Sequence, residues 1–385
     1  MEQFEVVVVG GGPAGSTAAR YVASAGRRVL LLERDQLPRY KPCGGGLAPK
    51  TIARLPFPVQ ELPNRQVSQI TFHLRGVSPV VWELPPEFSF HMVMRTDLDH
   101  RLVRAAVEAG AVLRTGEGVV GVQQLDGEYE VTTDSGHYRA PFVVGADGAT
   151  SVVRRSLGLA PRVQQGIALE CEIEAPLQTR QPYATTALFD VEAAPEGYGW
   201  IFPKKNHLSV GLGSMRPGGH PLCRLLHEFI LRYDLLAPAA LADLPVYVHP
   251  LPIASTGEPA RAGDVLLVGD AAGVADGFGG EGICHAMASG ELAAKTILRT
   301  LGGDARAMGE YDGELDRLIR QDHRFANLMG RIVRRFPDAS YHILTSAGEG
   351  RSVVIPIVLG EISFGEGLHR LPRLLALDRN HGSAK

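Results

Sequence analysis

The residues best suited to chemistry in this chain begin with a glycine-rich turn near the N-terminus. Gly10, Gly12 and Gly15 form a Gly-x-Gly-x-x-Gly pattern directly after the apolar run 4–9. Such a turn lets the backbone approach a pyrophosphate, and the N-terminus of the following helix attracts its negative charge. Glu33 follows Gly15 by eighteen residues, near the spacing of about 20 expected for an acid that accepts a ribose hydroxyl. An acid at this position disfavours a 2′-phosphate, so the pattern predicts a dinucleotide other than NADP.

A second strand–glycine–helix pattern spans residues 265–282, some 250 residues later. By itself it could be a buried strand followed by a glycine-bearing helix start. Together with the first turn it predicts FAD, because this dinucleotide is long enough to use both segments. The pyrophosphate would lie at Gly12, the ribityl chain at Asp270, and the flavin ring beside residues 279–282.

Two further segments carry distinctive side chains. Cys43 precedes three consecutive glycines, residues 44–46, where the missing Cβ atoms would let the backbone approach a flat ring. The alternative for this segment is a flexible surface loop. In the second segment Tyr198, Trp200 and Phe202 alternate with smaller residues, so on a strand they share one face. The three aromatic residues indicate either an apolar wall beside the flavin or ordinary core.

These residues need a scaffold, and the hydrophobic periodicity predicts one. Residues 4–9, 28–32, 111–114 and 142–146 are expected to be strands, and residues 14–25 and 96–109 helices. The fold class is α/β: a Rossmann-like FAD-binding domain with a parallel sheet, an antiparallel-sheet substrate domain and a helical C-terminal region. We expect the FAD-binding domain to be discontinuous, with residues 1–66, 94–164 and 254–300. Residues 67–93 and 165–253 would form the substrate domain, and 301–385 the helical region.

Composition narrows the function classes. The 385 residues carry a net charge of −3 without a basic block, which argues against a nucleic-acid partner. Cys43, Cys171, Cys223 and Cys284 lie far apart, so a disulfide framework or a zinc site is not expected and a reducing compartment fits. No signal peptide or long apolar run is visible. We therefore expect a cytoplasmic protein with, at most, peripheral membrane contact.

Taken in order along residues 4–300, the motifs resemble those of the geranylgeranyl reductase family, within the p-hydroxybenzoate hydroxylase-like flavoprotein superfamily. The resemblance rests on the glycine fingerprint, Pro42-Cys43-Gly44-Gly45-Gly46, Arg95 before Asp97-Leu98, Gly145-Ala-Asp-Gly148, Tyr198-x-Trp200-x-Phe202-Pro203 and Gly269-Asp270. It implies a reductase that saturates isolated double bonds of a prenyl chain on a lipid, a chlorophyll precursor or a quinone. The hydride would come from reduced flavin N5, and a proton would reach the other carbon.

The resemblance also implies roles for individual residues. Arg95 would contact the diphosphate-ribose side of FAD, Val119 would offer its backbone to adenine, and Asp147 would be structural. Cys43 and Tyr198 are both candidate proton donors, Trp200 the third catalytic candidate, and Phe202 would line the substrate. The residues expected at the cofactor are Gly10, Gly12, Pro13, Ala14, Gly15, Glu33, Arg34, Cys43, Gly44, Gly45, Arg95, Val119, Asp270, Gly280, Gly282 and Ile283.

Several alternatives stay open at this point. A monooxygenase or a flavin-dependent halogenase of the same superfamily is one, although halogenases carry Trp-x-Trp-x-Ile-Pro in place of residues 198–203. A non-catalytic prenyl-group escort is another. The electron donor could be NAD(P)H, ferredoxin or another reductant. Residues 353–359 and Leu368, Leu371, Leu374 and Leu375, with nearby arginines, suggest a C-terminal segment that docks on a membrane or packs on the protein.

Overall fold

The computed structural model describes residues 2–88, 90–159, 164–216, 221–253, 257–345, 353, 355–357 and 361–370. A six-stranded sheet forms the centre of the nucleotide-binding half, and its side chains are buried on both faces along four of the strands. Continuous apolar runs of this kind belong in a parallel sheet covered on both sides. In spatial order the strands are β19 (Arg261–Ala262), β20 (Val265–Leu267), β13 (Phe142–Gly145), β2 (Val6–Val9), β3 (Val29–Glu33) and β9 (Val112–Thr115), with β19 alone antiparallel to its neighbour.

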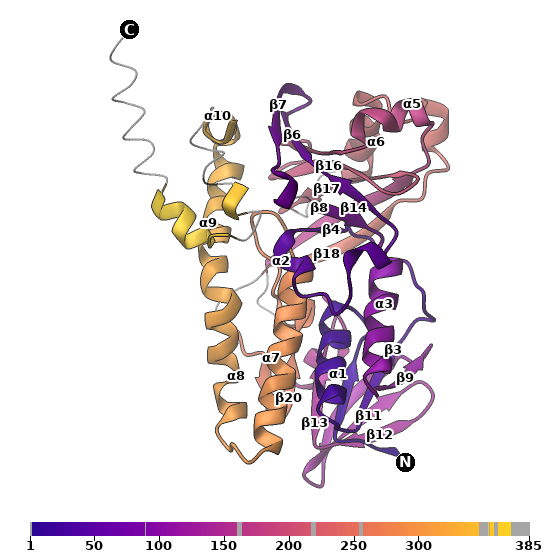
Figure 1. The fold of residues 1–385 in the computed structure, drawn as a ribbon, viewed down its shortest axis with the longest axis vertical. Helices are drawn as coiled ribbons and strands as arrows, with labels where there is room; N and C mark the ends of the chain where they lie inside the picture. Colours follow the sequence, from indigo (N-terminus) through magenta and orange to yellow (C-terminus); the bar gives the residue numbers. More distant parts are fainter. Residues whose placement is uncertain are drawn as a thin grey trace.

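Helices and a small sheet cover the two faces of this central sheet. The helix α1 (Pro13–Ser24) packs between α3 (Arg95–Glu108) and α7 (Ile283–Leu301) on one face (Figure 1). The other face packs on a four-stranded sheet with the order β1 (Glu2–Gln3), β12 (His137–Ala140), β11 (Glu128–Thr133) and β10 (Val119–Leu125). The short α4 (Val152–Ser156) lies against β10. The predicted parallel nucleotide-binding sheet is therefore confirmed.

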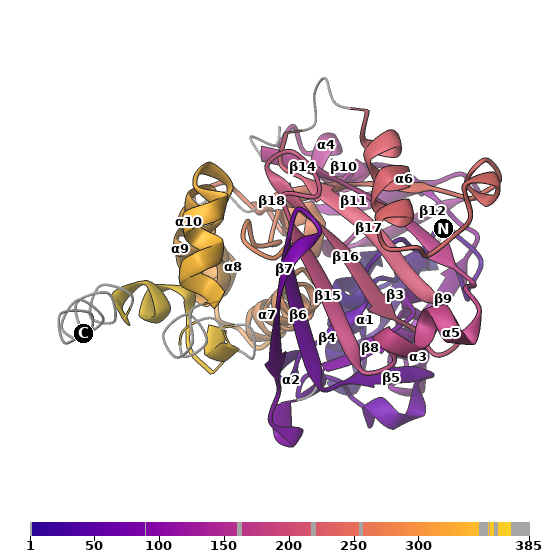
Figure 2. The ribbon, with the colours of Figure 1, turned by 90° about the horizontal axis from the view of Figure 1, so that it is seen from above.

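A seven-stranded sheet forms the other half of the molecule (Figure 2). Its strand order is β18 (Tyr247–Ile253), β14 (Gln164–Ile173), β17 (Leu208–Ser214), β16 (Gly197–Pro203), β15 (Thr186–Val191), β6 (Gln69–Leu74) and β7 (Val77–Glu83). The sheet is antiparallel as predicted except at β6 and β15, which run parallel and are joined by the long connection that a parallel pair requires. The helix α6 (Leu222–Arg232) packs on one face, and the short α5 (Leu177–Arg180) follows β14.

A three-stranded sheet joins the two halves. Its strands are β4 (Gly46–Leu47), β8 (Phe90–Val93) and β5 (Asn64–Val67), and α2 (Pro49–Ile52) follows β4. Leu47 and Val93 pack with Leu98 of α3 and Met287 of α7, so this sheet fixes the glycine loop of residues 44–46 against the nucleotide-binding half. How the chain divides into domains stays a prediction.

The C-terminal region is helical, as expected, and most of it is one long, nearly continuous helix. α8 (Ala307–Leu315) continues through one π-helical turn at Asp316–Arg320 into α9 (Gln321–Arg335), and α10 (Pro337–Thr345) follows. The fully buried Arg320 lies in this turn and donates hydrogen bonds to the carbonyls of Glu258 and Ala272. Arg320 in this turn thus connects the helix to the segment before β19 and to the loop after β20.

The candidate membrane segment lies largely outside the described residues. Its described members Val353 and Ile357 pack with Phe364 against α9, and Leu368 lies on the same cluster. The described part of the segment therefore packs on the protein. Within the described ranges, no helix is both long and apolar enough to cross a bilayer.

Candidate active site

A cavity of about 1030 Å³ runs between the central sheet and the seven-stranded sheet. We call the part near the glycine turn the charged half; it includes Glu33, Arg39, Lys41, Arg95 and Asp270. The part on the seven-stranded sheet is the aromatic half, and its rings are Phe72, Trp82, Phe189, Tyr198, Trp200 and Phe202. All the residues predicted at the site line this cavity except Gly15.

The glycine turn is shaped by close backbone contacts and leaves one position open. A Cβ on Gly10, whose φ is +107°, would lie 2.3 Å from the carbonyl oxygen of Ala146. A Cβ on Gly15 would lie 1.9 Å from the carbonyl oxygen of Gly10, so Gly15 serves helix packing and not the cavity wall. Gly12 is the N-cap residue of α1, and a Cβ on Gly12 would meet nothing closer than Arg95 Nη2, at 4.0 Å. A helix N-terminus with an open cradle and a cation beside it fits a pyrophosphate.

Glu33 at the end of β3 is buried and closes one wall of the charged half. Its Oε2 accepts a hydrogen bond from the Gly11 backbone N–H at 2.9 Å, and its Oε1 accepts one from the Asp35 N–H at 3.1 Å. Arg39 Nη2 lies 3.5 Å from the same carboxylate. Glu33 therefore holds the glycine turn in addition to the ribose role that the spacing predicts.

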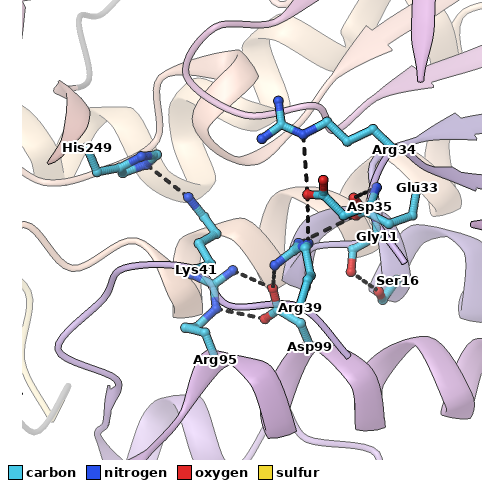
Figure 3. A network of polar contacts seen from close by, with 10 residues as sticks. All are labelled: Gly11, Ser16, Glu33, Arg34, Asp35, Arg39, Lys41, Arg95, Asp99 and His249. Atoms are coloured by element: carbon cyan, nitrogen blue, oxygen red, sulfur yellow. Dashed lines mark hydrogen bonds and ion pairs between the residues drawn. The ribbon is translucent and has the colours of Figure 1, made fainter. Parts of the chain in front are cut away.

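Arg95 belongs to a buried ion-pair network that the sequence analysis did not identify (Figure 3). Its guanidinium donates two hydrogen bonds to the Asp99 carboxylate, at 2.7 and 2.8 Å. Arg39 Nη1 lies 3.0 Å from Asp99 Oδ2, so one carboxylate holds two arginines. The four-residue spacing of Arg95 and Asp99 on a helix was an available signal for this pair.

Lys41, His249 and Asp270 form a second cluster of polar side chains. Of these three residues, only Asp270 was predicted at the site from the sequence. Lys41 Nζ lies 2.9 Å from His249 Nε2, which is itself 3.8 Å from Asp270 Oδ2. Figure 3 shows Lys41 extending from its loop toward His249 of β18. Burial and the charge of Arg95 lower the pKa of Lys41. Burial would raise the pKa of Asp270, but His249 and Lys41 outweigh it and lower that pKa, which keeps an acceptor ready for ribityl hydroxyls.

The Cys43 loop is held by protein contacts that explain two of its glycines. A Cβ on Gly44 would lie 2.8 Å from the Phe202 ring, and one on Gly45, at φ +64°, would lie 2.0 Å from the Val93 carbonyl oxygen. Buried Lys204 donates hydrogen bonds to the carbonyls of Gly44 and Val93 at 2.6 and 2.8 Å. These contacts hold the loop in place, so the alternative of a flexible surface loop is wrong. Gly44 and Gly45 allow close packing within the protein, in addition to the predicted approach to a flat ring.

Asp276 organises the loop before α7. Its buried carboxylate accepts hydrogen bonds from the backbone N–H groups of Phe278, Gly279 and Glu281, between 2.7 and 2.9 Å. The Tyr198 hydroxyl donates to the Gly279 carbonyl at 2.7 Å. Burial raises the pKa of Tyr198. The hydroxyl thus links β16 to the loop before α7, and its role as a proton donor stays a prediction.

The aromatic half extends well beyond the predicted wall. Tyr198, Trp200 and Phe202 share one face of β16, as expected, with neighbouring ring centroids 6.1 and 6.2 Å apart. Rings from β15, β6 and β7 continue the face: the centroid distances are 5.1 Å for Phe202–Phe189, 5.6 Å for Phe189–Phe72 and 4.6 Å for Phe72–Trp82. The result is a row of aromatic rings across four adjacent strands, starting beside Gly44.

Asp147 lies at the edge of the cavity but has a structural task. Its carboxylate accepts hydrogen bonds from the backbone N–H groups of Val152 and Val153 and from the Ser151 hydroxyl. It therefore caps α4. Among the described residues, no cluster of side chains has the composition of a metal site.

Comparisons with known proteins agree with this geometry. Residues 3–215 match the model of the FAD binding domain family. The geranylgeranyl diphosphate reductase of Rhodobacter capsulatus is 34% identical over 352 residues, which cover 88% of this chain and 85% of that protein. The menaquinone reductase of Mycolicibacterium smegmatis is 32% identical over 323 residues, which cover 78% and 77%. The crystal structure of a geranylgeranyl bacteriochlorophyll reductase-like protein from Thermoplasma acidophilum superimposes with a TM-score of 0.81 at 24% identity, covering 97% of this chain and all of that one.

Proposed function

Because the chain belongs to the geranylgeranyl reductase family of FAD-dependent oxidoreductases, we propose that it saturates isolated double bonds in the prenyl chain of a lipid, a quinone or a chlorophyll precursor. The observation that carries this proposal is the row of aromatic rings that leads from the sheet edge to the Cys43 loop inside one cavity. An apolar chain is stabilised in such a slot by about 0.8 kcal/mol for each CH₂ removed from water.

The charged half has groups suited to each part of FAD. The open N-terminus of α1 at Gly12, with Arg95 beside it, would hold the pyrophosphate, and Glu33 and Asp270 would accept hydroxyl hydrogen bonds. The loop held by Asp276 would border the ring. When bound and reduced, FAD supplies the hydride that an unactivated alkene requires.

The chain's own residues provide the rest of the chemistry. An isolated alkene has no carbonyl to accept negative charge, so positive charge develops on one carbon as a proton arrives at the other, and the hydride is delivered to the carbon that bears this charge. The faces of Trp200, Phe202 and Phe189 can stabilise that charge, as aromatic faces stabilise cations. Their apolar surface also excludes water from the reacting carbons. Cys43 lines the same cavity and directly precedes Gly44, which packs on the Phe202 ring, so its thiol is a candidate proton donor at this wall.

An anaerobic assay tests the proposal. FAD-loaded protein that has been chemically reduced would be incubated with geranylgeranyl diphosphate, and the products would be separated by mass. We expect a gain of two hydrogens for each reduced bond, together with oxidation of the flavin. Flavin that stays reduced and substrate of unchanged mass would overturn the proposal.

The same protein preparation also distinguishes the proposed reductase from a monooxygenase or a halogenase. If reduced protein exposed to air and a halide were to hydroxylate or halogenate an aromatic substrate, the monooxygenase or halogenase interpretation would replace ours. The intact set of Gly10, Gly12, Glu33 and Asp270 at the cavity argues against a non-catalytic escort, which needs no flavin.

A surface of α9 is suited to the membrane contact that a prenyl-lipid substrate would require. Leu328 and Ile332 are 37% and 44% exposed and lie four residues apart, so they share one face of α9. Phe336, directly after the end of α9, is 57% exposed. Exposed Arg331 and Arg335 lie on the same face. Apolar side chains flanked by arginines fit the surface of an anionic bilayer, where each basic residue adds roughly 1 kcal/mol.

Vesicle flotation tests this surface. We expect wild-type protein to float with vesicles that contain anionic lipid, and Ile332→Glu to float several-fold less. Val120→Glu changes an exposed apolar residue on distant β10 and serves as the control. Equal flotation of all three proteins would remove α9 from the membrane surface.

A further inference from the structure

Two carboxyl groups lie beneath the Cys43 loop and have no role in the mechanism so far. Glu170 and Glu172 are two residues apart on β14, so their side chains leave the same face of the sheet. Glu170 is 2% exposed and lines the cavity beside Cys43 and Gly44. A buried carboxyl at a reaction site requires an explanation, because burial of the charged form is unfavourable.

The contacts of Glu170 leave one oxygen free. Its Oε1 accepts hydrogen bonds from the Cys43 backbone N–H at 2.9 Å and from the Tyr40 hydroxyl at 3.0 Å. Its Oε2 is buried and has no hydrogen-bond partner among the described residues. If Oε1 alone were needed to anchor the loop, a neutral amide would serve as well. The free Oε2 is the position at which a carboxyl could carry a proton.

A chain of polar groups connects Glu170 with the surface. The Tyr40 hydroxyl also lies 3.3 Å from Glu172 Oε1, so it bridges the two carboxyls. Glu172 Oε2 lies 2.9 Å from His207 Nε2. The side chains of Glu172 and His207 are 19% and 20% exposed, so both reach solvent. Glu172 Oε2 and His207 Nε2 are themselves buried and are in ion-pair contact without hydrogen-bond geometry. Glu170, Tyr40, Glu172 and His207 are therefore successive neighbours from the cavity wall to a partly exposed histidine.

The charges around Glu170 favour its neutral form. Burial and the negative charge of Glu172 raise the pKa of Glu170 to about 7, although Lys204 and the two hydrogen bonds at Oε1 oppose them. The Lys204 ammonium donates to the carbonyls of Gly44 and Val93. On the neighbouring strand β18, Tyr247 pairs in register with Glu170, and His249 is directed to Lys41 and Asp270. No cation among these groups makes an ion pair with the Glu170 carboxylate.

We propose that Glu170 holds the proton consumed in alkene reduction and is recharged from solvent through Tyr40, Glu172 and His207. The Tyr40 hydroxyl delivers the proton to Oε1, and rotation of the carboxyl group brings it to the position of Oε2. This inference rests on the proposed function. Reduction of the alkene breaks its π bond and forms two C–H bonds. One uses a hydride, with its two electrons, from the reduced flavin, and the other uses the proton that leaves Glu170 as a carboxylate. Cys43, whose backbone N–H is bound to that carboxyl, lies where it would pass the proton on or gate its path.

The pH dependence of a single turnover tests the role of Glu170. In wild-type protein the rate of product formation should fall as pH rises through about 7, because the carboxyl loses its proton. Glu170→Gln keeps a hydrogen-bond acceptor for the Cys43 N–H but cannot give up a proton. We expect its rate to be about 100-fold lower at pH 6, the range of a lost general acid, and to be independent of pH. Glu174→Gln, an exposed carboxyl just beyond the same strand, is the control and should behave as wild type.

Tyr40→Phe tests the connection to solvent. It removes the hydroxyl between the two carboxyls, so steady-state turnover should slow several-fold more than the first turnover. Equal slowing of both rates, or a wild-type pH profile in Glu170→Gln, would overturn the proposal. If wild-type protein reduces no alkene at all, the proposed function fails instead.

Thermal unfolding gives a second readout that does not depend on activity. A carboxyl whose pKa is higher in the folded than in the unfolded protein stabilises the fold below its unfolded pKa, and this stabilisation is lost as pH rises through the folded value. The melting temperature of wild type should therefore fall by several degrees more than that of Glu170→Gln between pH 5 and pH 8. Parallel pH profiles would show that Glu170 carries no proton in this range and would overturn the proposal.

Discussion

The charged and aromatic halves of the cavity are built by different means. In the charged half, side chains of opposite charge pair at short range, and one carboxylate often serves several partners. Asp99 holds both Arg95 and Arg39, and Asp276 holds three backbone N–H groups. In the aromatic half, rings from four strands lie side by side, and Trp200 Nε1 is a buried donor with no hydrogen-bond partner among the described residues.

This difference predicts how each half responds to substitution. Removing one member of a buried ion pair leaves its partner as an uncompensated charge. Substitutions in the charged half should therefore lower both the stability of the fold and the retention of FAD. Removing one ring leaves its neighbours in place, so damage in the aromatic half should concentrate on the substrate. The following predictions run from the largest expected effect to the smallest.

The largest effect is expected from Asp99→Ala. The substitution leaves two arginines without their carboxylate in a buried position, which should lower the free energy of unfolding by about 3–5 kcal/mol. We also expect the purified protein to lack bound flavin. Glu108→Ala on the same helix removes a carboxylate that makes exposed ion pairs, which contribute about 0–1 kcal/mol. Denaturant unfolding measures the stability of both variants, and absorbance measures their bound flavin. A stable, yellow Asp99→Ala protein would show that the ion-pair network of Asp99 is not required for stability or for FAD retention.

Trp200→Ala should impair the aromatic half of the cavity and leave the charged half intact. We expect the protein to keep its flavin spectrum while single-turnover reduction of the prenyl chain falls about 100-fold, as expected when a substrate is misplaced. Phe229→Leu is the matched control, because Phe229 packs on Gly199 from the opposite face of the same sheet. It should reduce stability without a comparable loss of turnover. Normal turnover by folded Trp200→Ala would remove this ring from the substrate site.

Glu33→Ala should weaken FAD binding and destabilise the fold less than Asp99→Ala does, because Arg39 keeps Asp99 as a partner. The substitution removes the acceptor for the Gly11 N–H and for a ribose hydroxyl, which corresponds to about 1.5–3 kcal/mol. This is roughly a 10- to 100-fold increase in the FAD dissociation constant. Fluorescence titration of the deflavinated protein measures it. Glu33→Gln keeps an acceptor and should retain more affinity; if both variants bind as wild type, the acid does not contact the ribose.

Cys43 should give the smallest and most selective effect. Cys43→Ala leaves the backbone N–H that Glu170 binds, so the loop and flavin reduction by dithionite should be preserved. Alkene reduction should slow by up to about tenfold if the thiol passes a proton on. Cys43→Ser separates this role from packing, because a hydroxyl can carry a proton but fits an apolar wall less well. Equal turnover by all three proteins would assign the side chain to packing alone.

Much of the fold could be predicted because its signals are local. Continuous apolar runs identified β2, β3 and β13, and a period of two placed Tyr198, Trp200 and Phe202 on one face. The glycine turn and Glu33 were predicted from spacing within one βαβ unit, where chain connectivity limits the geometry. The Arg95–Asp99 pair was equally local and could have been found from its helical spacing.

The sequence by itself therefore determined the elements, the faces of each strand and the FAD-binding motifs. The tertiary structure alone decided which faces meet. Lys41 reaches His249 across 208 residues, and Cys43 reaches Glu170 across 127. Phe72 joins Phe189 because β6 and β15 pair in parallel at one particular register. The period of a strand specifies which side chains share a face but not which strand lies beside it, since strand pairing and register depend on packing across the whole sheet.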